Sequence, residues 1–108
     1  MLNADAFLYL DRIREITSKL PDVKEGKSYG TPGFHIKKKF FARLKEDGRT
    51  LVVRTRNRDA LLKKDPTVFF ITNHYKDYPA VLVRLEKIKM SALKKTLIDA
   101  WKEQLSEK

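Results

Sequence analysis

The 108 residues have the length of one small domain, and 42% of them are hydrophobic, which is sufficient for a single core. The absence of cysteine excludes disulfides, thiolate nucleophiles and cysteine-based zinc sites, and no apolar run approaches the roughly 20 residues of a membrane-spanning helix. Lysine and arginine number 24 against 14 acidic residues, and this net charge of +10 favours polyanionic partners. We therefore expect one soluble, cytoplasmic domain over residues 1–108.

A first helix is predicted ahead of Pro21, because apolar residues recur there at near-helical spacing. The residues expected on its buried stripe are Phe7, Leu10, Ile13, Ile16 and Leu20. Such a helix packs on a sheet, and we assign it no chemistry.

The glycine-rich segment 23–36 reads as strand, turn, strand. The spacing of Gly26, Gly30 and Gly33 matches neither a P-loop nor a dinucleotide-binding loop, and no helix start follows. This loop is therefore expected to be structural.

Residues 37–39 form a run of three lysines between two strand-like segments, which is typical of a hairpin tip. Residues 46–49 follow as a second turn around an Asp-Gly pair. In the strands on either side of that turn, period-two alternation groups Phe41 with Arg43 and Arg54 with Arg56. One face of the sheet is therefore expected to be basic.

The second half of the chain begins with a short helix over residues 58–64. Two strands rich in β-branched and aromatic residues, 68–72 and 80–85, are expected at the centre of the sheet, and a C-terminal helix follows. The predicted fold is a two-layer α+β domain in the order α-β-β-β-α-β-β-α, with the helices on one face of a largely antiparallel sheet.

Three motifs and one tryptophan resemble the MmcQ/YjbR family. The motifs are EGKSYGTPGF (25–34), FARL (41–44) and DPTVFFITNHYKDYPAVLVRL (65–85), and the tryptophan is Trp101 in the last helix. The resemblance implies a fold similar to the secretion-chaperone-like or YjbR-like class. It also implies a role in DNA binding through hairpin wings, a double-wing arrangement, and it supplies no catalytic residues.

The positive charge is concentrated in the middle of the chain. Residues 37–64 carry a net charge of +8, against zero for residues 1–36 and +2 for residues 65–108. The side chains expected to contact phosphates are Lys37, Lys38, Lys39, Arg43, Arg54, Arg56, Arg58, Lys63 and Lys64. We predict a monomeric, non-enzymatic protein that binds DNA or another polyanion with weak sequence preference, because no recognition helix is evident.

No catalytic or metal-binding constellation is readable, and no cofactor is expected, because the two histidines lack spaced carboxylate partners and no serine or threonine lies in a triad context. The loop that carries His74, Tyr75 and Tyr78 admits two interpretations. It could edge a small-molecule pocket or stack a base, or it could pack over the sheet edge with its hydroxyls bonded to backbone. A protein-interaction module and a merely solvated lysine surface also remain as alternatives.

Overall fold

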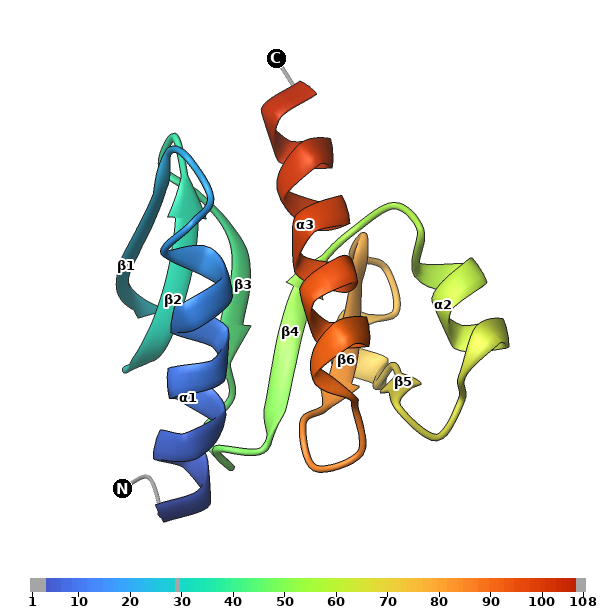
Figure 1. The fold of residues 1–108 in the computed structure, drawn as a ribbon. Helices are drawn as coiled ribbons and strands as arrows, with labels where there is room; N and C mark the ends of the chain where they lie inside the picture. The colour runs from blue at the N-terminus through green and yellow to red at the C-terminus, as the bar shows by residue number, and fades with distance from the viewer. Residues whose placement is uncertain (1–3, 29, 107–108) are drawn as a thin grey trace.

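In the computed structural model, which describes residues 4–28 and 30–106, a sheet of six antiparallel strands is covered on one face by helices (Figure 1). The elements are α1 (Ala4–Thr17), β1 (Val23–Ser28), β2 (Thr31–Ile36), β3 (Lys39–Leu44), β4 (Thr50–Arg54), α2 (Arg58–Lys64), β5 (Phe69–Phe70), the 3-10 helix η1 (Asn73–Tyr75), β6 (Ala80–Arg84) and α3 (Met90–Ser106). The predicted α+β order is confirmed, and the glycine-rich segment supplies both β1 and β2. Among the described residues, no helix combines the length and the apolar character that a membrane span needs.

The sheet has the strand order β1-β2-β3-β4-β6-β5. The prediction of two central strands from residues 68–72 and 80–85 is therefore wrong for the first of them, because β5 is a two-residue strand at the edge. Beyond Phe70 the chain leaves the sheet and enters η1, so the β-branched residues that follow pair with no strand.

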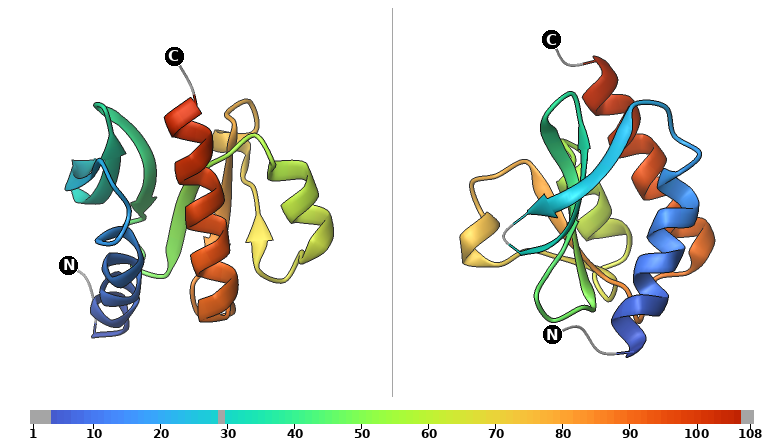
Figure 2. Two further views of the ribbon diagram at one scale, coloured as in Figure 1. Left: turned by 45° about the horizontal axis from the view of Figure 1, so that its top comes forward. Right: turned by 90° about the vertical axis from the view of Figure 1, so that its left-hand side faces the viewer.

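The main core lies between the sheet and the helices α1 and α3, which lie on the same side of the sheet (Figure 2). On α1 the buried apolar residues are Leu10, Ile13 and Ile16, whereas Phe7 is 57% exposed, contrary to the predicted stripe. Three residues turn an α-helix by about 300°, so each step of three falls about 60° short of a full turn. Phe7 and Ile16, three such steps apart, consequently point to opposite sides of α1.

A β-bulge interrupts the pairing of β2 with β3. Phe34 pairs with Ala42 and His35 with Phe40, so Phe41 is an extra residue on β3. Because of this extra residue, Phe41 and Ala42 both pack in the main core, and Phe40 packs on the other face. The prediction that Phe41 shares a face with Arg43 is therefore wrong, since strict alternation ends at the bulge.

Asp47 holds the turn between β3 and β4. Its carboxylate accepts hydrogen bonds from the backbone N–H groups of Arg49 (2.8 Å) and Thr50 (2.9 Å) and from the Thr50 hydroxyl (2.8 Å). Partial burial opposes ionisation of Asp47, but these hydrogen bonds outweigh it and lower its pKa. Gly48, at φ 71°, takes the left-handed position that the Asp-Gly pair predicted.

Candidate functional site

The sheet face opposite the helices carries a second, smaller core beneath the η1 loop, residues 71–79 (Figure 2). Tyr75 is buried there and packs with Val52, Ala80 and Leu82, and Phe40 lies against the same cluster. The ring of Tyr75 thus lies on the face of the sheet, which differs from the predicted position over the sheet edge.

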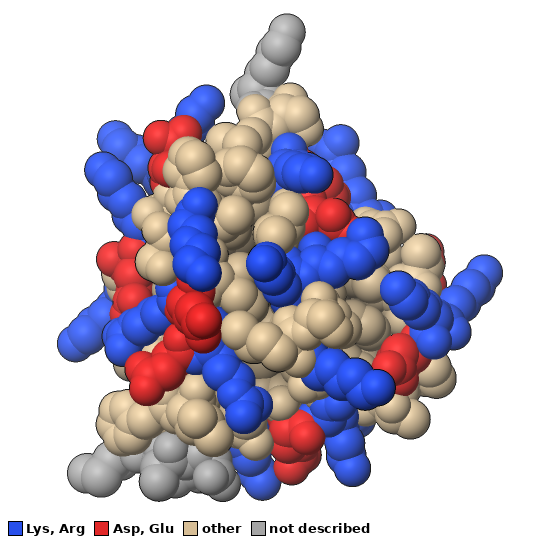
Figure 3. All heavy atoms as spheres, in the orientation of Figure 1, with Lys and Arg blue, Asp and Glu red and all other residues tan. Residues whose placement is uncertain are grey.

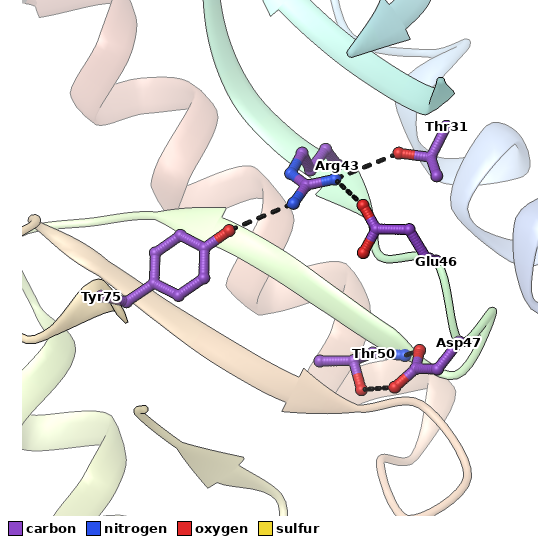
Figure 4. A network of polar contacts seen from close by, with 6 residues as sticks. All are labelled: Thr31, Arg43, Glu46, Asp47, Thr50 and Tyr75. Atoms are coloured by element: carbon purple, nitrogen blue, oxygen red, sulfur yellow. Dashed lines mark hydrogen bonds and ion pairs between the residues drawn. The ribbon is translucent and has the colours of Figure 1, made fainter. Parts of the chain in front are cut away.

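Arg43 projects from β3 onto this face and is buried, with a side chain only 9% exposed. Its guanidinium donates to the Thr31 hydroxyl (3.2 Å), the Glu46 carboxylate (3.3 Å) and the Tyr75 hydroxyl (3.3 Å), as Figure 4 shows. Burial opposes the positive charge, but the hydrogen bonds to Tyr75 and Glu46 outweigh it and raise the pKa of Arg43. Arg43 therefore joins β2, β3 and the η1 loop, a position different from the exposed phosphate contact predicted for it.

Arg58, the first residue of α2, fixes the η1 loop through the backbone. One of its guanidinium nitrogens donates to the carbonyl oxygens of Tyr75 (3.2 Å), Lys76 (3.0 Å) and Tyr78 (2.7 Å). Hydrogen bonds from a charged donor are stronger than neutral ones. The loop is consequently tied to α2, and this contact accounts for Arg58 without a phosphate.

The η1 loop gathers three rings above the sheet. Tyr75 meets His74 edge to face at a centroid distance of 4.8 Å and Tyr78 at 6.1 Å, and the rings of His74 and Tyr78 are tilted by only 32° at 6.2 Å. A cavity of about 110 Å³ lies among these rings and the sheet, and Phe40, Arg43, Arg54, Pro79 and Ala80 complete its lining. The loop therefore does form a pocket, which we call the ring pocket.

The β2–β3 hairpin ends in a two-residue turn made of Lys37 and Lys38, and Lys39 begins β3. Both turn residues have left-handed backbones, with φ values of 50° and 73°, and both are exposed. Two-residue hairpin turns of this kind favour Asn-Gly, because both central residues need positive φ. The hairpin tip predicted from the lysine run is confirmed.

The ends of three neighbouring strands lie together at this tip. Ala42 pairs with Val53, so the chain beyond Val53, with Arg54 and Arg56, runs alongside the beginning of β3. Arg54 in turn pairs with Ala80, which follows the η1 loop. The tip lysines, the two arginines and the η1 loop thus occupy one end of the sheet.

The carboxyl-terminal part of α3 supports the same end. The Glu103 carboxylate accepts hydrogen bonds from the Thr55 hydroxyl and the Arg56 backbone N–H, and the Gln104 amide donates to the Phe40 carbonyl oxygen (3.2 Å). The helix therefore fixes the backbone from which Arg54 and Arg56 project.

Lys63 and Lys64 lie apart from this end. They occupy the last turn of α2, which packs beside β5 and β6. These two strands form the edge of the sheet farthest from β1 (Figure 1). On the face formed by α1 and α3, basic and acidic side chains are interspersed (Figure 3). The basic residues of the middle segment are thus divided among separate surfaces.

Two contacts on the open sheet face, opposite α1 and α3, could not be predicted from the sequence. Arg84 lies over the ring of Phe70 at 4.0 Å, and the Lys45 ammonium lies 5.6 Å from the centre of the Tyr75 ring. Both are cation–π contacts between segments distant in sequence, and no local pattern signals them. Within the described ranges, no three His, Asp or Glu side chains are grouped so as to hold a metal ion.

The fold and this site define a small α+β domain in which the short, aromatic η1 loop covers part of the sheet face opposite the helices. A family model described as YjbR matches residues 18–103, and the chain belongs to the MmcQ/YjbR family. Over 42 residues it is 45% identical to the uncharacterized protein Rv2570 of Mycobacterium tuberculosis and to the uncharacterized protein Mb2600 of Mycobacterium bovis. This match covers 39% of the chain and 33% of each relative, so the chain spans about a third of the length of the curated relatives it matches. No solved structure gives a significant match.

Proposed function

We propose that this protein binds nucleic acid through its phosphates, without catalysis and with little sequence preference. The contacts come from five side chains at one end of the sheet, which we call the basic row: Lys37, Lys38, Lys39, Arg54 and Arg56. The observation that carries the proposal is the pair of lysines held in left-handed conformation at the hairpin tip.

That conformation is unfavourable for lysine. A left-handed backbone brings the Cβ atom close to the following carbonyl oxygen and costs roughly 1–2 kcal/mol per residue, unless glycine or, less effectively, asparagine occupies the position. Both lysines are exposed, so burial of their side chains does not offset this cost. Residues in sparsely populated backbone conformations cluster at functional sites. Here the two strained residues supply positive charge at an exposed hairpin tip.

The geometry of the row suits an extended polyanion. It runs across neighbouring strands from the β2–β3 turn to the end of β4, where the η1 loop joins β6. Strands lie about 4.8 Å apart, so the row from β2 to β4 spans roughly 10 Å. This distance corresponds to about three base pairs of B-DNA at ~3.4 Å each.

Low sequence preference follows from the elements involved. A turn and a strand end supply the charges, and the lysine and arginine side chains suit phosphate oxygens. Base readout in the major groove needs an exposed helix or ribbon that presents side chains to base edges. The helices α1 and α3 instead cover the opposite face of the sheet.

The test is fluorescence anisotropy with a labelled duplex across a salt series. Five phosphate contacts predict a slope of log affinity against log salt of roughly −4.5, at about 0.9 per phosphate. Replacing Lys37, Lys38 and Lys39 with alanine should weaken binding of all sequences alike and make the slope shallower by about 3.

The matched control is a triple alanine variant at Lys87, Lys89 and Lys94. These exposed lysines lie between β6 and α3 and in the first turns of α3, and their removal changes net charge by the same amount. The control should retain most of the affinity. Equal losses in both variants would mean that net charge alone attracts DNA, and a lack of binding at low salt would refute the function itself.

A further inference from the structure

The ring pocket has a composition that neither the packing of the sheet nor the basic row explains. Its walls combine the rings of His74, Tyr75 and Tyr78 with the guanidinium-bearing side chains of Arg43 and Arg54. Tyr78 is 57% exposed, although its backbone carbonyl is fixed by Arg58. The loop is therefore held in place while one of its rings remains accessible to a ligand.

The size of the pocket limits what it can hold. An enclosed cavity of about 150 Å³ accommodates one benzene ring, so the 110 Å³ here is too small for a fused pair and takes in most of a single six-membered ring. The rings of His74 and Tyr78 lie 6.2 Å apart at a tilt of 32°. A ring inserted between them needs about 7 Å, at roughly 3.5 Å per contact, so a small rotation of the exposed Tyr78 ring would admit it.

The charge at the pocket favours a ring that carries an anionic group. Arg43 closes one side, with its guanidinium held by Thr31, Glu46 and Tyr75. Arg54 lines the same pocket and projects from the β4 end that also forms part of the basic row. A ligand in which one sugar joins a flat ring to a phosphate could thus place the ring in the pocket and the phosphate beside Arg54 of the basic row.

We propose that the ring pocket binds one unpaired pyrimidine base, stacked on Tyr78, whose phosphate lies at Arg54. The base can come from a single strand or from a free mononucleotide, and both present the same chemistry. The strand form rests on the proposed function, because it shares Arg54 with the basic row. Base stacking on an aromatic side chain tolerates many sequences, so the limited pocket volume, not hydrogen bonding, sets the preference for one ring.

The experiment compares a labelled oligothymidylate with an abasic strand of the same length and phosphate charge. Anisotropy should show the abasic strand binding about five- to tenfold more weakly to the wild type, since stacking contributes substantially per base. Tyr78→Ala should remove this difference, and Tyr78→Phe, which retains the ring, should keep it. Oligoadenylate should bind the wild type more weakly than oligothymidylate does, because a purine does not fit the pocket. Tyr78→Ala should reduce this difference in affinity.

Phe7→Ala is the matched control, because Phe7 has the same 57% exposure and lies on α1, across the sheet. It should leave both strands unaffected. Melting curves of the variants check folding, and Tyr78 is exposed enough for its replacement to be tolerated. If the abasic strand binds the wild type as well as oligothymidylate does, or if Tyr78→Ala behaves like Phe7→Ala, the inference is overturned while the basic row stands.

A titration with thymidine monophosphate separates the two sources of the base. The sequence has two histidines, His35 and His74, so their ring NMR signals can be distinguished. Saturable shifts that are larger at His74 than at His35, the cross-strand partner of the pocket residue Phe40, support the pocket even if no strand binds, in which case the proposed function alone fails. If no strand binds and the nucleotide shifts neither histidine, both proposals are refuted.

Discussion

Replacing Lys37 with asparagine and Lys38 with glycine should stabilise the protein and weaken the nucleic-acid binding that we propose. The two residues sit at φ values of 50° and 73°, where Asn-Gly is the favoured pair. Relief of a penalty of roughly 1–2 kcal/mol at Lys38, less the greater freedom of glycine in the unfolded chain, leaves a gain of about 0.5–1.5 kcal/mol. For a chain of this size that gain raises the Tm by roughly 2–7 °C.

Chemical denaturation and duplex anisotropy, measured on the same preparations, test the two halves of this expectation. The control is Lys37→Gln with Lys38→Gln, which removes the same charge but leaves an unfavourable backbone at both positions. It should lose the same affinity and gain no more than about 0.5 kcal/mol, as surface substitutions usually do. If the glutamine pair is stabilised as much as the Asn-Gly pair, repulsion among neighbouring lysines, not backbone conformation, is the cost at the tip, and our reasoning is wrong.

Three further predictions concern side chains whose hydrogen bonds hold the β3–β4 turn, the Arg43 network and the η1 loop. Asp47→Ala should lower the free energy of unfolding by about 1–3 kcal/mol at neutral pH, measured with urea, because three hydrogen bonds to its carboxylate are lost. Since the pKa of Asp47 is lowered in the folded state, this difference should be full above about pH 4 and shrink as the pH falls through the folded pKa; a pH-independent difference would contradict it. Arg43→Met keeps much of the buried bulk but loses the bonds to Thr31 and Tyr75, and should cost about 1–3 kcal/mol; an unchanged urea midpoint would show that the network is dispensable. Arg58→Ala should accelerate amide hydrogen exchange within residues 75–80 and leave exchange in α1 unchanged, and equal exchange in the loop would rule out its anchoring by Arg58.

Much of the fold could be predicted from local signals. Turn formers bounded the short helix to the residues found, Arg58–Lys64, and the lysine run marked the hairpin tip. These features depend on neighbours in sequence. The edge position of β5 could not be predicted this way, because strand order is decided by which faces pack, and the composition of Phe69 and Phe70 suits a central or an edge strand equally.

The site was less accessible to sequence reasoning than the fold. The run of basic residues correctly marked a segment rich in charge, but it could not separate Arg43, which is buried, from Arg54, which is only half-buried. That distinction depends on Tyr75, which is 32 residues away and accepts a hydrogen bond from Arg43. The hydrogen bonds of Arg58 to the η1 loop span 17 to 20 residues and likewise leave no local trace.

The extra residue Phe41 lets the two adjacent phenylalanines of β3 serve different parts of the molecule. Cross-strand partners share a face, so Lys39 lies on the side of its partner Ile36, and Phe40 faces the ring pocket. Deleting Phe41 would restore strict alternation in β3 and leave Lys39 and Phe40 on the faces that they now occupy. The deleted chain could keep every strand and the aromatic wall of the pocket, but the main core would lose a fully buried ring. A one-codon deletion at this pair would therefore lower stability and spare the site.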